Sequence, residues 1–186
     1  MNKVEKIEQK PMSNDDILEY FPDAKIITNA EFKEARSIDD ILDKNKPFDG
    51  VIILYLSGPS QGHWTTLCRY GTGENKDCFI EFFDSYGENP STVYNYVDEN
   101  LRKQLGNDRD YVLDLLHKCP YNVIYNNVQY QSDKKDIMTC GRHCCFRLYN
   151  LLKYGMGLTE YHNYMKKLKN KTKLNYDQIV SINIHK

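Results

Sequence analysis

The chain has almost no excess charge and no long apolar run. Its 186 residues include 25 Lys and Arg against 26 Asp and Glu, for a formal net charge of -1. This balance excludes a protein that binds nucleic acid through bulk positive charge. No apolar stretch approaches the roughly 20 residues that a membrane-spanning helix needs. We therefore expect neither a nucleic-acid partner nor a membrane partner.

The N-terminus lacks the apolar segment of a secretion signal, because its first residues, MNKVEKIEQKPM, are mainly charged and polar. We therefore expect a chain that is not secreted and stays in a reducing compartment. Its six cysteines are then expected to be thiols and not a disulfide framework, although Cys68 and Cys78 on neighbouring predicted strands could face each other.

The chain also lacks the paired CxxC knuckles of structural zinc sites. The nearest alternative would be zinc held by His143 together with Cys140, Cys144 and Cys145. These residues have no second pair of ligands elsewhere in the sequence. We therefore expect no metal and no other cofactor.

The length of the chain suits a single domain that buries its own core. We expect a flexible tail over residues 1–12 and one domain over residues 13–186. Apolar runs predict strands within residues 24–29, 50–58, 63–71, 77–87 and 121–131, and GTGENK at residues 71–76 predicts a hairpin loop. Capping signals and periodicity predict helices at residues 15–21, 90–106, 108–118 and 159–168.

One further helix is predicted to begin at the motif MTCGRHCC, residues 138–145. Apolar residues then recur three or four positions apart and predict an inner face: Cys144, Cys145, Leu148, Leu151 and Leu152. On this reading Cys144 and Cys145 pack the helix as small apolar residues. The side chains at positions 142, 147 and 153 are basic and fall off this face.

Cys140 stands at the N-terminal end of that predicted helix. Unpaired N–H groups and the helix dipole favour an anion there, and they lower the pKa of a thiol. Thr139 and Gly141 beside it would let a substrate approach the backbone, and the Cys140 N–H could donate to an oxyanion. A lone cysteine is more often a buried structural thiol, so a nucleophile needs a base nearby.

His63 is the histidine best placed to be that base. It begins a predicted strand, follows the loop SGPSQG and precedes the one tryptophan, Trp64. Asp84 ends the next predicted strand, in IEFFDSYG. In an antiparallel hairpin the start of one strand lies beside the end of the next, so we expect the two side chains at one edge of the sheet. Asp84 also suits the turn that follows it.

An oxyanion donor could come from the polar segment that precedes Cys140. Gln129 and Gln131 are the candidates, and in a strand both would lie on the same face. Gln131 is nearer to Cys140 in the sequence. For Trp64, a half-buried core position and a place in a substrate cleft are both open.

The set GHW, FFDSYG, a Gln and TCGRHCC, in the order His, Asp, Gln, Cys, resembles the adenovirus-protease and SUMO-protease superfamily of cysteine peptidases. The resemblance spans about residues 50–152 and most resembles viral members. It implies an α+β fold, with a mixed, mainly antiparallel sheet packed against the helix of the catalytic Cys. The spacing from Gln131 to Cys140 is longer than the family pattern.

The resemblance also implies a role for each matched residue. Cys140 would be the nucleophile, His63 the general base, Asp84 its orienting group and Gln131 the oxyanion donor. Trp64 would line the cleft near a small substrate residue, commonly Gly. Substrate contacts would also come from three positions next to these residues: Gly62, Thr139 and Gly141.

The function so implied is a cysteine protease that cuts a protein substrate after small residues. We expect it to process a viral polyprotein or virion precursor, in the host-cell cytoplasm and with possible packaging in the virion. An alternative is an isopeptidase that removes ubiquitin or a ubiquitin-like modifier such as SUMO from host proteins. A more distant alternative is a binding module without catalysis.

Overall fold

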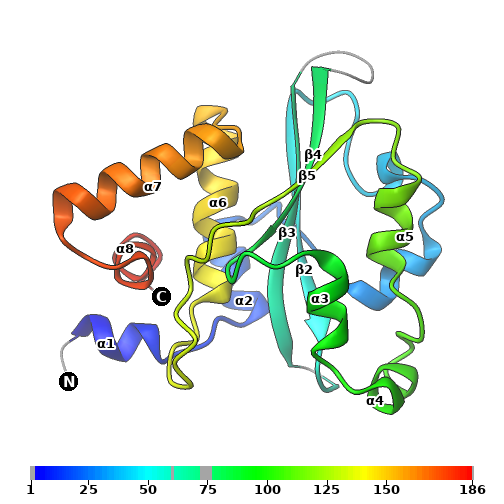
Figure 1. Cartoon of the computed structure of the whole chain (residues 1–186), viewed down its shortest axis with the longest axis horizontal. Helices are drawn as coiled ribbons and strands as arrows, with labels where there is room; N and C mark the ends of the chain where they lie inside the picture. The colour runs from blue at the N-terminus through cyan, green and yellow to red at the C-terminus, as the bar shows by residue number, and fades with distance from the viewer. Residues whose placement is uncertain (1–2, 60, 72–76, 186) are drawn as a thin grey trace.

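The computed structural model describes residues 3–59, 61–71 and 77–185 (Figure 1). Within these residues one sheet has the strand order β1-β2-β3-β4-β5. The strands are β1 (Lys25–Thr28), β2 (Phe48–Leu56), β3 (Gly62–Gly71), β4 (Cys78–Asp84) and β5 (Asn122–Tyr125). The long central strands pair antiparallel, and the short outer strands pair parallel to them. The predicted mixed sheet is confirmed, while most of the predicted loop, residues 72–76, lies outside the described residues.

Helices cover both faces of this sheet (Figure 1). One side carries α1 (Lys3–Glu8), α2 (Asn14–Tyr20), α6 (Cys140–Tyr154), α7 (Leu158–Thr172) and α8 (Tyr176–Asn183). The other side carries α3 (Pro90–Asn95), α4 (Glu99–Gln104) and α5 (Tyr111–His117), with short 3-10 helices at Asn29–Glu34 and Ile38–Asp40. The molecule therefore has three layers, and the predicted α+β class is confirmed.

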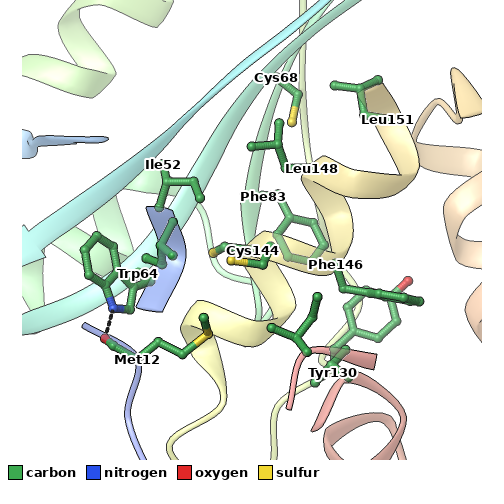
Figure 2. Packing of buried hydrophobic residues seen from close by; sticks show 14 of the residues in the cluster. Met12, Ile52, Trp64, Cys68, Phe83, Tyr130, Cys144, Phe146, Leu148 and Leu151 are labelled. Atoms are coloured by element: carbon green, nitrogen blue, oxygen red, sulfur yellow. Dashed lines mark hydrogen bonds between the residues drawn. The ribbon is translucent and has the colours of Figure 1, made fainter. Parts of the chain in front are cut away.

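Two hydrophobic clusters fill the spaces between these layers within the described part of the chain. Alternate residues of β2 belong to the two clusters. Ile52 faces the cluster under α6, whereas Val51 and Ile53 face the cluster under α5. Figure 2 shows the first cluster, where Trp64 and Phe83 of the sheet meet Cys144 and other side chains of α6. A central sheet buried on both faces explains the nearly continuous apolar run in β2.

Helix α6 is buried on almost every side, which the apolar pattern did not predict. Cys144 and Cys145 are fully buried as expected, but Leu152 is 44% exposed. Arg142 and Arg147, expected off the inner face, have no exposed surface. The reason is that α6 contacts the sheet on one side and α8 and the N-terminal segment on others. Arg142 donates to the backbone carbonyls of Ile184 at 3.1 Å and Lys10 at 2.5 Å, on two of those neighbours.

Arg147 forms a buried ion pair with Glu81 of β4. Its Nε and Nη2 donate to the two carboxylate oxygens, each at 2.7 Å, and its Nη1 donates to the Met156 carbonyl at 3.0 Å. Both side chains are completely buried. This two-pronged geometry fixes the helix against the strand in distance and in orientation.

Over the described residues 3–12, the segment that was expected to be a tail forms helix α1 and contacts the rest of the fold. Helix α1 packs against α8, Met12 is 4% exposed, and the Met138 N–H donates to the Glu8 carbonyl at 2.7 Å. Much of this attachment runs through backbone carbonyls, which leave no mark in a sequence pattern. The composition of the segment alone therefore does not reveal these contacts.

Two smaller expectations are also corrected. The single helix predicted over residues 90–106 is two helices, because Asp98 caps α4 by accepting from the Asn100 N–H at 2.9 Å. Cys68 pairs with Glu81 and Cys78 with Gly71, so the two cysteines lie on opposite faces of the sheet. Both are free thiols.

The Glu81–Arg147 pair generates a stability prediction. Glu81→Gln removes the negative charge and one acceptor oxygen, so the Arg147 charge stays buried without a matching charge. We expect the free energy of unfolding to fall by about 3–5 kcal/mol. Urea unfolding followed by circular dichroism measures this. The control is Glu99→Gln, which breaks an exposed pair with Lys103 and should change stability little. A loss at Glu81 no larger than that of the control would contradict the stated role of the pair.

Candidate active site

His63 and Asp84 meet at the end of the paired strands β3 and β4. Thr65 pairs with Asp84, so His63, two residues earlier on β3, shares a face of the sheet with Asp84. Nε2 of His63 hydrogen-bonds to Oδ1 of Asp84. This contact leaves the other ring nitrogen, Nδ1, for a second partner.

The Asp84 carboxylate is completely buried and held by the turn that follows it. Its Oδ2 accepts from the N–H groups of Tyr86 at 3.0 Å and Glu88 at 3.1 Å. The Tyr86 ring stacks on the imidazole of His63, with the ring centroids 5.3 Å apart. Just after β5, Nδ2 of Asn126 donates to the Asp84 carbonyl at 2.5 Å. Backbone and ring contacts thus orient both members of the pair.

Neither Tyr86 nor Asn126 was predicted from the sequence to belong to this site. Tyr86 lies two residues after Asp84. The signal for its position was the turn after Asp84, which brings its ring back over β3. Asn126 follows β5 and had no distinguishing pattern.

Cys140 is the first residue of α6, and its side chain is partly exposed. The helix starts at the same end of the sheet, and the thiol hydrogen-bonds to His63. The backbone N–H groups of Trp64 and Gly141 also donate to the sulfur. The structure therefore brings the three residues Cys140, His63 and Asp84 into one hydrogen-bonded series.

The electrostatics of this series favour an ion pair. Burial by itself raises the pKa of the Cys140 thiol, but the hydrogen bond and charge of His63, with the two backbone donors, outweigh it and lower that pKa. Burial lowers the pKa of His63, while hydrogen bonds to Asp84 and Cys140 raise it to about 10. A lowered thiol pKa beside a raised imidazole pKa favours the pair of thiolate and imidazolium over the neutral pair.

A cleft of about 650 Å³ opens onto the Cys140 sulfur. Its walls are the ends of β2 and β3 on one side and residues 11–15 of the N-terminal segment on the other. Trp64 is 5% exposed and its indole Nε1 donates to the Met12 carbonyl at 3.0 Å, as Figure 2 shows. Trp64 therefore belongs to the core and also lines the cleft, and its contact with a substrate stays a prediction.

The three small or polar residues predicted to contact substrate have different places. Gly62 lines the cleft, and a Cβ there would lie 2.0 Å from the Tyr55 carbonyl oxygen. Gly141 is buried, and its Cβ would lie 3.0 Å from Met12 and 3.1 Å from Trp64. Thr139 is also fully buried, and its hydroxyl donates to Asp177. Gly141 and Thr139 thus pack the start of α6 and do not line the cleft.

The two glutamines lie in an irregular segment, which corrects the expectation of a strand that continues to residue 131. Strand β5 ends at Tyr125, because the Asn126 side chain then binds the backbone at Asp84 and Val128. Gln129 is exposed, and its Nε2 donates to the Gln131 carbonyl and to Asp133. Both of its amide protons therefore have acceptors.

Gln131 is buried, with 2% of its surface exposed. Its Oε1 accepts from the Ser85 hydroxyl at 2.8 Å, and its Nε2 donates one proton to the Ile137 carbonyl at 3.1 Å. Its own N–H donates to the Ser85 carbonyl at 2.9 Å. Since an amide nitrogen has two protons, one N–H of Gln131 remains for another acceptor.

Neither a metal site nor a membrane span is found in the parts of the chain that the structure describes. No group of three or more His, Cys, Asp or Glu side chains there could hold a metal ion. His143 instead binds Asp177, and Cys144 and Cys145 lie in the core. No helix among the described residues is long and apolar enough to cross a membrane.

Comparison with known proteins places the chain among viral proteins. It is 31% identical over 183 residues to the uncharacterized protein V9 of Sputnik virophage, and the match covers 98% of both chains. The chain belongs to the family of this virophage protein. No family model matches it. A viral source was one of the expectations from the sequence.

Solved structures show the fold. The crystal structure of the ASFV pS273R protease matches 95% of this chain and 67% of that chain, with a TM-score of 0.54 and 12% identity. The Rickettsia bellii effector protein RickCE matches 81% of this chain and 54% of its own, with a TM-score of 0.38 and 18% identity. The chain therefore shares the fold of the ASFV protease, which confirms the fold that the resemblance implied.

The raised pKa of His63 generates a prediction. NMR of ring-labelled histidine should give a His63 pKa of about 10 in the intact chain. Cys140→Ala removes one partner that raises this pKa, so the value should fall, and Asp84→Asn should lower it as well. Cys144→Ala, on the same helix but in the core, should leave the titration of His63 unchanged. An equal His63 pKa with and without Cys140 would contradict the ion pair.

Proposed function

We propose that the chain is a cysteine peptidase in which Cys140 is the nucleophile. The observation that supports this most is the hydrogen-bonded series of Cys140, His63 and Asp84 at the end of an open cleft. A nucleophile in contact with a base, and a base in contact with a buried carboxylate, is the arrangement that acyl transfer requires. The fold shared with a viral protease agrees with this chemistry.

In the proposed reaction the Cys140 thiolate attacks the carbonyl carbon of a peptide bond. A carbon–sulfur bond forms, and the electron pair of the carbonyl moves to its oxygen. His63 then gives its proton to the leaving nitrogen as the carbon–nitrogen bond breaks, which leaves a thioester. His63 next removes a proton from water, whose oxygen displaces the sulfur and releases the acid. Asp84 orients the imidazole throughout.

Two donors would stabilise the oxyanion that forms in each half of the reaction. The Cys140 N–H lies in the first turn of α6, where backbone N–H groups have no acceptor within the helix. The second donor is the remaining N–H of Gln131, which is held in place from Ser85. Donors that are fixed before the reaction are worth about 10²–10³-fold in rate each. Gln129 has no amide proton left for this role.

The cleft favours a substrate with a small residue before the scissile bond. Its walls near the sulfur are the Trp64 ring and the N-terminal segment, and these two parts are joined by the hydrogen bond to the Met12 carbonyl. Because the chain has a viral relative, the substrate that we propose is a precursor protein of the same virus. A conjugate of ubiquitin or of a ubiquitin-like modifier is the alternative outcome of the test below.

Cys140→Ala should abolish cleavage of a co-expressed viral precursor, because it removes the attacking atom. The expected loss is at least about 10³-fold. Cys119→Ala, a partly exposed thiol in the cluster under α5, is the matched control and should cleave as the unaltered chain does. Gel electrophoresis and mass spectrometry of the fragments give both the rates and the residue before each cut.

The substrate class is tested with probes that end in an electrophile. Peptides of the precursor that end in Gly should label Cys140, whereas ubiquitin and SUMO probes should not. Labelling by a modifier probe alone would assign the isopeptidase function instead. Full cleavage by Cys140→Ala would refute a cysteine peptidase of either kind.

A further inference from the structure

A buried carboxylate lies behind the start of α6 and takes no part in the reaction described above. Asp177, in the first turn of α8, is 3% exposed. Its Oδ1 accepts from the Thr139 hydroxyl at 2.5 Å and from His143 Nε2 at 3.0 Å. Its Oδ2 accepts from the Ser132 N–H at 3.0 Å. One side chain thus holds three donors from two separate parts of the chain.

These donors are the immediate neighbours of the two proposed oxyanion donors. Thr139 precedes Cys140, and Ser132 follows Gln131. Between them runs a connection over residues 133–138 that is mostly exposed, with Ile137 its partly buried member. A connection on the surface is a weak spacer, because few packed contacts limit its movement. The two oxygens of one planar carboxylate join its ends directly.

The Asp177 carboxylate keeps its charge in this buried place. Burial raises its pKa, but hydrogen bonds from His143, Thr139 and Ser132, with the charge interaction of His143, bring the pKa below its usual value. Hydrogen bonds to a charged acceptor are about twice as strong as neutral ones. A buried charge is nevertheless a poor means of stabilising a fold, since apolar residues of similar size often do as well. Its neighbours Ile179 and Val180 already pack α8 into the core.

We propose that Asp177 is a positioning residue, which sets the distance between Gln131 and Cys140. Ser85 anchors Gln131 from the sheet side, and Asp177 anchors the same segment from the helix side. The single oxyanion of the substrate then meets the Gln131 amide and the Cys140 N–H together. On this account the C-terminal helix α8 is part of the catalytic unit although it does not touch the substrate. The inference rests on the function proposed above.

The main test is Asp177→Asn, which keeps the size of the side chain and removes one of its two acceptor oxygens. We expect kcat for peptide hydrolysis to fall by about 10–100-fold, since a displacement near 1 Å has effects of this size. KM should stay within about 3-fold, because no substrate contact is lost. Alkylation of Cys140 by iodoacetamide forms no oxyanion, so its rate should also stay within about 3-fold.

A double-mutant cycle separates positioning from general stability. Gln131→Ala removes the group through which Asp177 acts, so adding Asp177→Asn to it should cost less than about 3-fold further in kcat. Asp110→Asn is the matched control, because Asp110 is another partly buried carboxylate. It caps α5 by accepting from the Leu113 N–H, and α5 lies on the far side of the sheet. Its kcat should equal that of the unaltered chain.

Hydrogen exchange at the Ser132 amide gives a readout that does not depend on activity. The exchange should become faster in Asp177→Asn, and an unchanged rate would overturn the inference. If that variant does not fold, Thr139→Val removes the hydroxyl link alone and should show the same split between kcat and alkylation.

Three kinetic results would overturn the proposal: an unchanged kcat, an equal loss in the Gln131→Ala background, or a parallel loss of alkylation. A chain without any hydrolysis, and with Cys140 no more reactive than Cys119, would instead refute the proposed function. The exchange experiment would then still decide whether Asp177 holds Ser132.

Discussion

The geometry of the site depends on the buried ion pair between Arg147 and Glu81. Glu81 lies three residues before Asp84 on β4, and Arg147 lies seven residues after Cys140 on α6. The pair clamps the helix to the strand at both carboxylate oxygens, with no exposed surface on either side chain. The start of α6 and the end of β4 are thereby held at a fixed separation, and His63 fills the space between them. Removing either member of this pair is strongly destabilising, because it leaves the other charge buried without a partner.

The reactivity of the site follows from a balance between burial and pairing. Burial alone would keep both the thiol and the imidazole neutral. The hydrogen bonds along Cys140, His63 and Asp84 reverse that preference for both groups. The other thiols of α6 show what burial does without such partners, since it raises the pKa of Cys145 to about 12. The same helix thus holds one thiol with a lowered pKa and two with raised pKa values.

Local patterns predicted the strands, the helix start at Cys140 and the meeting of His63 with Asp84. These features depend on neighbours along the chain and on the pairing of adjacent strands. Alternating apolar residues and helix-capping residues in the sequence indicate such local features. The sequence did not predict the ordered N-terminal segment or the binding of Trp64 to the Met12 carbonyl, because a backbone acceptor has no sequence signature. Nor did it predict the contacts of Asp177, whose partners Thr139 and Ser132 lie 38 and 45 residues away. Gln131 was predicted from its order in the motif, but the irregular backbone around it is set by Ser85 and Asn126.

The proposed chemistry depends on one step, in which His63 converts Cys140 to a thiolate. The pH dependence of the alkylation rate of Cys140, read by mass spectrometry of its peptide, tests this step directly. In the unaltered chain the rate should remain high well below the pH at which an ordinary thiol, with a pKa of about 8.5, loses its proton. In His63→Ala the whole profile should move to higher pH, because burial still raises the pKa of Cys140 and His63 no longer lowers it. Identical profiles for the two proteins would contradict the account.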